Sequence, residues 1–263
     1  MATIITLITD FRTSDGYMGA IFGVIKSINP NAEIITIASN IPAADIRKAS
    51  QALSNSYRFY PAGTIHMVVV DPSVGPRRRA LIVDDDRYLF LGPDNGVLSP
   101  VYRSRPGARI RQINNEKFRL VSRSETFHGR DLFAPAAAYL SHGIPPDEFG
   151  PEIADPVMLD YPELEVVGND IVGRVIDIDA FGNLITNISA QYVDDAAVIQ
   201  FCGRTIQGLS RCYSDVPEKH PLAYIGSSDT LEIAINRGDA ANYFGALINE
   251  EVRLVGAGHR LNA

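Results

Sequence analysis

Three short runs of apolar, mostly β-branched residues constrain the fold more than any other feature of this sequence. The runs cover residues 3–9, 33–38 and 64–70. Such runs are typical of strands buried on both faces of a sheet. Residues 16–28 carry apolar side chains at helical spacing, and a second helix is predicted over 45–58 with Asp45 as its cap. This β-α-β-α-β order predicts an α/β fold, a mostly parallel sheet flanked by helices.

A change of composition between residues 145 and 169 divides the chain. This segment holds five prolines and seven acidic residues but no lysine or arginine. Such a composition predicts a linker without a regular packed element. We therefore expect an N-terminal α/β domain over residues 1–160 and a smaller C-terminal domain over 161–263. Short strand patterns with turn signals predict that the second domain is mainly β and barrel-like.

Charge, cysteine content and hydropathy exclude several classes of protein. The formal net charge of −7, from 24 basic and 31 acidic residues, argues against a general nucleic-acid binder. Two cysteines, Cys202 and Cys212, are too few for a disulfide-framed secreted module or a four-cysteine zinc site. The first ten residues lack the basic start of a signal peptide, and no apolar stretch reaches the ~20 residues that cross a bilayer. We expect a cytoplasmic protein that does not enter a membrane.

Two acidic residues follow predicted parallel strands. Asp10 and Asp71 stand where the runs 3–9 and 64–70 end, and open α/β sheets bind ligands beyond the carboxyl ends of their strands. We expect both carboxylates at one crevice, although aspartate at such positions also commonly caps a turn. Asp71 opens a Pro- and Gly-containing loop with arginines at 77–79, which could fold an arginine back onto the carboxylate and favour its ionised form. Arg77 is expected to be solvated.

Two further loops combine polar and aromatic residues. His128 lies in the string Thr-Phe-His-Gly-Arg-Asp before a helix predicted over 131–141, where an imidazole could orient a ligand or handle a proton. The turn around Phe181 and Asn183 could stack a flat ring and read its edge, or be a turn only. We interpret Pro93-Asp94-Asn95-Gly96 as a structural turn, and the other four histidines as structural. The sequence contains no phosphate-binding loop, HExxH or GxSxG motif.

Together these strings resemble the S-adenosylmethionine (SAM) hydroxide adenosyltransferases, adenosine-forming SAM hydrolases related to fluorinating and chlorinating enzymes. The matching segments run in family order: Thr9-Asp10-Phe11 with Asp15-Gly16-Tyr17, Asp71 to Arg79, Pro93 to Gly96, Thr126 to Asp131, Phe181-Gly182-Asn183 with Thr186-Asn187-Ile188, and Leu231 to Ala234. The resemblance implies an α/β domain, a β-barrel-like domain, and a homotrimer whose active sites form between subunits.

The resemblance also implies roles for individual residues. The catalytic set would be Asp71, Arg78 and His128. The implied substrate-binding residues are Asp10 for the ribose hydroxyls, Asn183 and Phe181 for adenine, Asp179 and Ser227 for the methionine part, and Glu232 and Ile235 to complete the pocket. Halogenating relatives carry tyrosine in place of Asp71 and lack this set, which favours water over halide. The loop departs from the usual family string at Ser73, where glycine is more common.

The predicted reaction is hydrolysis of SAM to adenosine and methionine at the 5′ carbon, with no metal and no cofactor. A sulfonium leaves as a neutral thioether, so the chemical demand falls on placing and deprotonating water. The residues do not decide which member of the catalytic set accepts the proton. Two alternatives stay open, a SAM-dependent halogenase and a non-catalytic adenosine or SAM sensor. The residues alone would also allow a metallohydrolase with Asp10, Asp71 and His128 as ligands.

Overall fold

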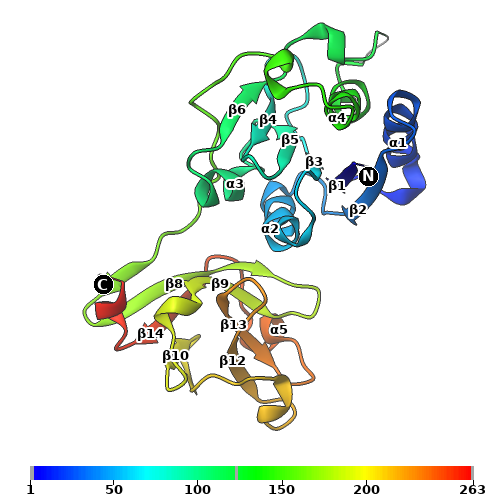
Figure 1. Cartoon of the computed structure of the whole chain (residues 1–263). Helices are drawn as coiled ribbons and strands as arrows, with labels where there is room; N and C mark the ends of the chain where they lie inside the picture. Colours follow the sequence, from blue (N-terminus) through cyan, green and yellow to red (C-terminus); the bar gives the residue numbers. More distant parts are fainter. Residues whose placement is uncertain (1–2, 122–123, 262–263) are drawn as a thin grey trace. The chain divides into compact units, whose positions relative to one another are not determined.

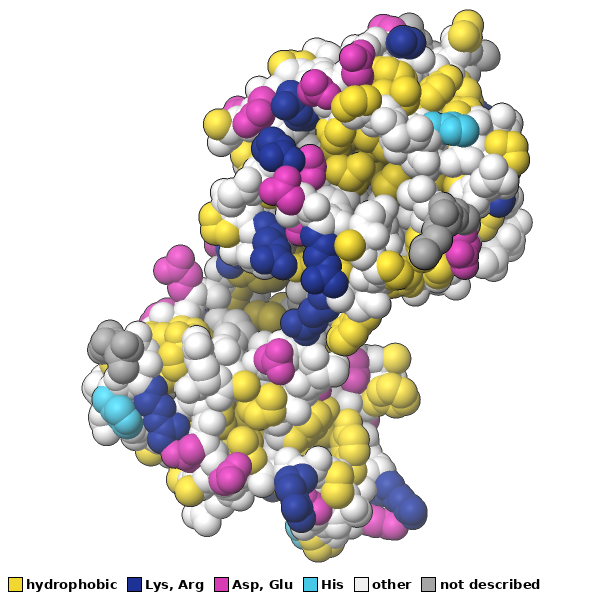
Figure 2. Space-filling model, in the orientation of Figure 1, with side chains coloured by type: hydrophobic (Ala, Val, Ile, Leu, Met, Phe, Trp, Pro, Cys, Tyr) yellow, Lys and Arg dark blue, Asp and Glu magenta, His cyan; other side chains and the backbone are white. Residues whose placement is uncertain are grey.

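The computed structural model describes residues 3–121 and 124–261, which divide into two compact units between Leu159 and Asp160 (Figure 1). The domain boundary expected from the sequence, between residues 160 and 161, lies one residue later. Among the described residues, no helix is long and apolar enough to cross a membrane. On the face shown in Figure 2, acidic and basic side chains are interspersed on each unit.

A six-stranded sheet in the order β2-β1-β3-β5-β4-β6 forms the centre of the first unit. Its strands are β1 (Ile4–Thr9), β2 (Glu33–Ala38), β3 (Ile65–Val69), β4 (Ala80–Asp84), β5 (Leu89–Pro93) and β6 (Arg109–Gln112). Strands β2, β1, β3 and β5 run parallel, whereas β4 is antiparallel to both of its neighbours. The prediction of a mostly parallel sheet is confirmed.

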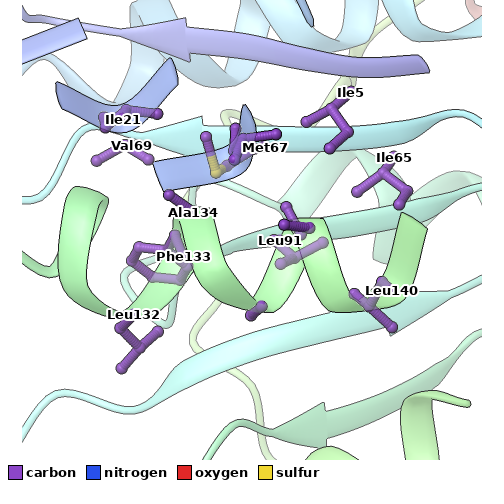
Figure 3. Close-up of a cluster of buried hydrophobic side chains, with 14 of the residues drawn as sticks. Ile5, Ile21, Ile65, Met67, Val69, Leu91, Leu132, Phe133, Ala134 and Leu140 are labelled. Atoms are coloured by element: carbon purple, nitrogen blue, oxygen red, sulfur yellow. The ribbon is translucent and has the colours of Figure 1, made fainter. Parts of the chain in front are cut away.

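Helices cover both faces of this sheet and bury alternate residues of each strand. In β3, Met67 and Val69 belong to a buried cluster with helices α1 (Tyr17–Ile28) and α4 (Ala134–Ser141), which Figure 3 shows. The intervening Val68 packs with α2 (Ile46–Ser56) and α3 (Ser99–Ser104) on the other face. Burial on both faces explains why the central strands β1 and β3 are mostly apolar. The predicted cap of α2 is confirmed, because the Asp45 carboxylate accepts a hydrogen bond from the Lys48 amide.

The prediction that residues 145–169 contain no regular packed element is wrong. Residues Pro146–Phe149 form a 3₁₀ turn, and Phe149 is fully buried with its ring stacked on Phe118 at a centroid distance of 4.2 Å. Glu152 bridges to Arg111 of β6. The Phe149 ring and backbone hydrogen bonds such as that from the Gln112 amide to the Pro151 carbonyl thus fix the first part of the segment on the first unit, despite its proline and charge content. Near its other end, strand β7 (Glu165–Val167) pairs with the second unit.

The second unit is a nearly closed antiparallel sheet in the order β11-β10-β14-β8-β9-β13-β12, with β7 paired to β8 (Figure 1). Its other strands are β8 (Asp170–Ile178), β9 (Leu184–Ser189), β10 (Val198–Phe201), β11 (Arg204–Gln207), β12 (Pro221–Ile225), β13 (Thr230–Ile235) and β14 (Glu251–Val255). A short helix, α5 (Ala240–Phe244), packs against the core of the sheet. The predicted β-barrel-like architecture is confirmed.

One of the histidines interpreted as structural, His66 on β3, is enclosed by aromatic rings. It is 0% exposed, and its ring is stacked on Phe90 at 5.2 Å and lies edge-on to Tyr57 and Tyr88. Its Nδ1 shares a hydrogen bond of 2.8 Å with Thr6 Oγ1, while Nε2 has no partner within the described chain. Burial lowers the pKa of His66 from 6.5 to about 4.

This buried imidazole predicts a loss of stability in mild acid. Below pH 6.5 the unfolded chain binds a proton at His66 that the folded chain does not, so stability falls until the pH reaches about 4. Over that interval, the proton binding of His66 lowers the free energy of unfolding by about 3 kcal/mol. In His66→Phe, the free energy of unfolding should fall less steeply between pH 6.5 and 4 in urea titrations. Equal slopes in the two proteins would contradict the assignment.

Candidate active site

The loop after β3 folds back on itself so that Arg78 meets Asp71. Arg78 Nε donates to Asp71 Oδ1 at 3.2 Å, and Arg78 Nη2 forms an ion pair with Asp71 Oδ2. The two side chains are only 6% and 7% exposed. Burial lowers the pKa of the Arg78 guanidinium, and the Asp71 carboxylate opposes that shift. The neighbouring Arg77 is exposed to solvent, as the sequence analysis expects.

His128 completes this group from another part of the chain. Its Nδ1 lies 2.9 Å from Arg78 Nη2. A guanidinium has only donors, so Nδ1 must be the acceptor, and the neutral ring therefore carries its proton on Nε2. Burial and then the charge of Arg78 lower the pKa of His128. The imidazole is therefore neutral around pH 7 and presents a donor at Nε2.

Asp71 and His128 of this group line a pocket at the carboxyl ends of β1 and β3. Asp10, Phe11, Asp71, Phe127, His128 and Gly129 are among the residues that line it. Strands β1 and β3 are neighbours in the sheet, so the residues that follow them, Asp10 and Asp71, reach the same crevice. Asp10 Oδ2 accepts a hydrogen bond from the amide of Ala44 at 3.1 Å. The juxtaposition that the sequence analysis expects is therefore present.

A π-helical turn, Gly129–Phe133, begins directly after His128 and continues into α4. A Cβ atom at Gly129 would lie 3.1 Å from Val69 Cγ1 and 3.2 Å from Ile21 Cδ1. The absence of a side chain thus lets the turn rest directly on β3 and α1. Asp131 fixes the preceding loop, because its carboxylate accepts from the amide of Ser124 at 2.5 Å. These contacts determine where His128 lies relative to Asp71.

The second unit holds the residues expected around adenine and methionine. In the turn between β8 and β9, Asp179 Oδ1 accepts from the amides of Phe181 and Asn183, each at 2.8 Å, and Asp179 Oδ2 accepts from Asn183 Nδ2 at 2.8 Å. Asn183 is buried, whereas the Phe181 ring is 77% exposed. Ser227 lies in the turn after β12, and the buried Ile235 ends β13.

A chain of hydrogen bonds that sequence reasoning missed connects Asn183 to Glu232. Asn183 Nδ2 donates to the Tyr213 hydroxyl at 3.1 Å, Tyr213 and Tyr224 share a hydrogen bond of 3.1 Å, and Tyr224 donates to Glu232 Oε2 at 2.5 Å. Burial raises the pKa of Glu232. Both amide protons of Asn183 are used here, so its Oδ1 is oriented as the acceptor. Nothing in the sequence marks Tyr213 or Tyr224, because they lie 30 or more residues from the turn.

The ten predicted site residues therefore fall into two groups. Asp10, Asp71, Arg78 and His128 lie together in the first unit. In the second unit, Asp179, Asn183 and Glu232 share one network. Within residues 3–121 and 124–261, no three His, Cys, Asp or Glu side chains form a group that could hold a metal ion.

Two family models match the chain. The one described as the SAM hydroxide adenosyltransferase N-terminal domain matches residues 5–150, and its C-terminal counterpart matches residues 173–253. The chain is also similar to curated proteins named (R)-S-adenosyl-L-methionine hydrolase. The one from Methanocaldococcus jannaschii is 35% identical, covering 96% of this chain and 95% of the relative. The one from Thermus thermophilus is 33% identical, covering 94% and 98%.

A solved structure also matches both units. It is the crystal structure of an uncharacterized conserved protein from Thermotoga maritima, with a TM-score of 0.88 and 34% sequence identity, covering 96% of this chain and 99% of that one. Fluorinases are more distant curated relatives, and the one from Actinoplanes sp. is 23% identical. The resemblance drawn from the sequence motifs is therefore confirmed.

Proposed function

This chain belongs to the SAM hydroxide adenosyltransferase family, and we propose that it hydrolyses SAM to adenosine and methionine. The observation that carries the proposal is the Asp71–Arg78–His128 group, in which the Asp71–Arg78 ion pair is buried and Asp71 and His128 line one pocket with Asp10. The names of the full-length curated relatives support the same reaction. Those names specify the (R) configuration, so we propose the (R) epimer at sulfur as the preferred substrate.

In the proposed mechanism, water attacks the 5′ carbon of SAM opposite the sulfur. A C–O bond forms, the C–S bond breaks, and its electron pair neutralises the sulfonium to give the thioether of methionine. The water oxygen loses one proton as the adenosine 5′ hydroxyl forms. Because the leaving group departs neutral, we propose that the reaction needs neither a metal nor a cofactor. Positioning the nucleophile and accepting its proton are then the enzyme's tasks.

The donor and acceptor pattern of the site suggests how these tasks are divided. With Nδ1 accepting from Arg78, the neutral His128 ring offers only an N–H at Nε2. It would therefore orient the water oxygen as a donor, while the Asp71 carboxylate accepts the proton. Arg78, which contacts both side chains, would keep Asp71 and His128 in fixed positions relative to each other. Asp10 would bind the ribose hydroxyls, and Asn183 Oδ1 would accept from the adenine amino group.

We further propose that the protein is a homotrimer with active sites between subunits, as the family resemblance implies. The first unit supplies the water-activating residues, and the second supplies those expected to bind adenine and methionine. We also propose a cytoplasmic location. Cys202 and Cys212 are both free thiols exposed to solvent, a state that fits a reducing compartment.

The test is incubation with each sulfonium epimer of SAM in oxygen-18 water, followed by mass spectrometry of the products. The proposal predicts methionine and adenosine with the label on the 5′ oxygen, formed faster from the (R) epimer. A 5′-halo nucleoside in the presence of chloride or fluoride would instead identify a halogenase. Tight adenosine binding without turnover of either epimer would identify a sensor. Activity that a chelator abolishes would contradict metal independence.

Asn183→Ala tests the assignment of the second unit. Removing the amide oxygen that accepts from the adenine amino group should weaken adenosine binding by about tenfold. This factor corresponds to the loss of about one hydrogen bond. Isothermal titration calorimetry with adenosine measures this, and Asn242→Ala on α5 is the control, because Asn242 also donates to a neighbouring aspartate. Equal adenosine affinity in wild type and Asn183→Ala would remove Asn183 from the site.

A further inference from the structure

The loop that carries Asp71 and Arg78 crosses another strand of the sheet. It connects β3 to β4, but these strands are not neighbours, because β5 lies between them. Strand β5 runs parallel to β3, so its carboxyl end lies at the same edge of the sheet as Asp71. The chain leaves β5 there through Pro93-Asp94-Asn95-Gly96, the string interpreted from sequence as a structural turn. The turn therefore lies between the two ends of the loop.

Asn95 holds the end of the loop that leaves β3. Its Nδ2 donates to the carbonyl of Val70 at 3.0 Å, and Val70 directly precedes Asp71. Its Oδ1 accepts from the amide of Val97 at 3.2 Å, which fixes the side chain in its own turn. Through these two bonds the direction in which the chain enters the loop is fixed one residue before Asp71.

Asp94 holds the other end of the loop, at the start of β4. Its carboxylate is 3% exposed and accepts from Arg79 Nε at 2.7 Å and from the amide of Val157 at 2.7 Å. Its own amide donates to the carbonyl of Arg79 at 2.9 Å. The same carbonyl accepts from Arg78 Nη1 at 2.9 Å. Asp94 thus fixes both the side chain and the carbonyl of Arg79, and that carbonyl orients the Arg78 guanidinium.

Between these ends the loop contains a turn, in which the amide of Val74 donates to the carbonyl of Asp71 at 3.2 Å, but no helix or strand. Pro72, Ser73, Pro76 and Arg77 are exposed, and a loop without anchors would lose conformational entropy when it orders. The 2.9 Å contact between Arg78 and His128 needs a defined loop conformation. We propose that Asp94 and Asn95 are positioning residues, which clamp the two ends of the loop and thereby place Arg78 between Asp71 and His128. The effect on turnover rests on the proposed function, whereas the geometric effect does not.

Asn95→Ala removes both hydrogen bonds of one anchor, and Asn95→Asp keeps the acceptor for Val97 while losing the donor to Val70. For both variants we expect kcat on SAM to fall by about 10²-fold, because displacement of reacting groups by about 1 Å costs that much. The KM should change little, since neither residue lines the pocket. Asn29→Ala is the matched control. Asn29 directly follows α1 as its C-terminal cap, away from the strand ends that carry Asp10 and Asp71, and makes one donor bond and one acceptor bond of its own.

The decisive measurement is the titration of His128 by NMR, assigned as the resonance missing in His128→Gln. Burial and then the charge of Arg78 lower the pKa of His128, and a loosened clamp would weaken the second effect, so that pKa should rise toward the ordinary value in Asn95→Ala and Asn95→Asp. If the variants have an unchanged His128 titration and an unchanged kcat, and only a lower melting temperature, the turn has a structural role alone and the proposal is wrong. If wild type does not hydrolyse SAM, the proposed function fails, and the titration alone decides the clamp.

Discussion

Replacing Asp71 by asparagine is expected to lower kcat on SAM by about 10³-fold. The variant keeps the size of the side chain and one acceptor for Arg78, but loses the charge that would accept a proton from water. The contacts of Asn183 and Asp10 are unaffected, so binding of adenosine should persist. Product chromatography measures turnover, and calorimetry with adenosine measures binding. Asp86→Asn, in the exposed turn between β4 and β5, is the control and should retain full activity.

Two outcomes would contradict this assignment. Wild-type turnover in Asp71→Asn would exclude Asp71 as the proton acceptor. A parallel loss of turnover and adenosine binding would show that Asp71 is a ligand for the nucleoside rather than for water. In either case His128 would become the next candidate for the base. To accept a proton at Nε2 it would have to carry its own proton on Nδ1, the opposite of the tautomer that its contact with Arg78 requires.

Arg78→Met is expected to destabilise the fold as well as to abolish activity. It leaves the Asp71 carboxylate, which is 7% exposed, without its ionic partner, and a buried charge stripped of its partner costs about 3–5 kcal/mol. It also removes the stacking of the guanidinium over Phe133, at 5.4 Å from the ring centroid. Urea denaturation at pH 7 measures the change in the free energy of unfolding.

Two further variants separate the buried charge from the loss of packing. Asp71→Asn combined with Arg78→Met should recover part of the lost stability, because no unpaired charge remains. Arg109→Met breaks a pair whose arginine side chain is 48% exposed and should change the free energy of unfolding little. Equal destabilisation in Arg78→Met and in the double variant would attribute the loss to packing alone.

The fold could be predicted where burial imposes one pattern on a whole element. Strands such as β1 and β3, buried on both faces, are mostly apolar, and α2 begins directly after a residue that caps it. Edge elements carry no such pattern. Strand β6 reads Arg-Ile-Arg-Gln, and strand β11 is mostly exposed, so neither could be recognised locally. These strands form because a neighbouring strand offers hydrogen bonds, which is information from outside the segment.

The candidate site could be predicted in part for a similar reason. Strand order alone brings Asp10 and Asp71 together, because parallel neighbours end at the same edge. Among Arg77, Arg78 and Arg79, local sequence cannot decide which one faces Asp71, and only the family resemblance selected Arg78. The structure shows the physical reason, since Arg79 is held by Asp94 and Asp155, while Arg77 is exposed.

A loop fixed at both ends and largely exposed between them can change without disturbing what its ends hold. Lengthening a connection adds only a small entropic cost, about 0.6 kcal/mol for each doubling. Residues 72–77 are therefore a segment in which natural variants could acquire insertions or new side chains over the pocket while the sheet stays intact. Selection for a nucleophile other than water could then change residues between the two ends of the loop, while the anchors Asp94 and Asn95 stay the same.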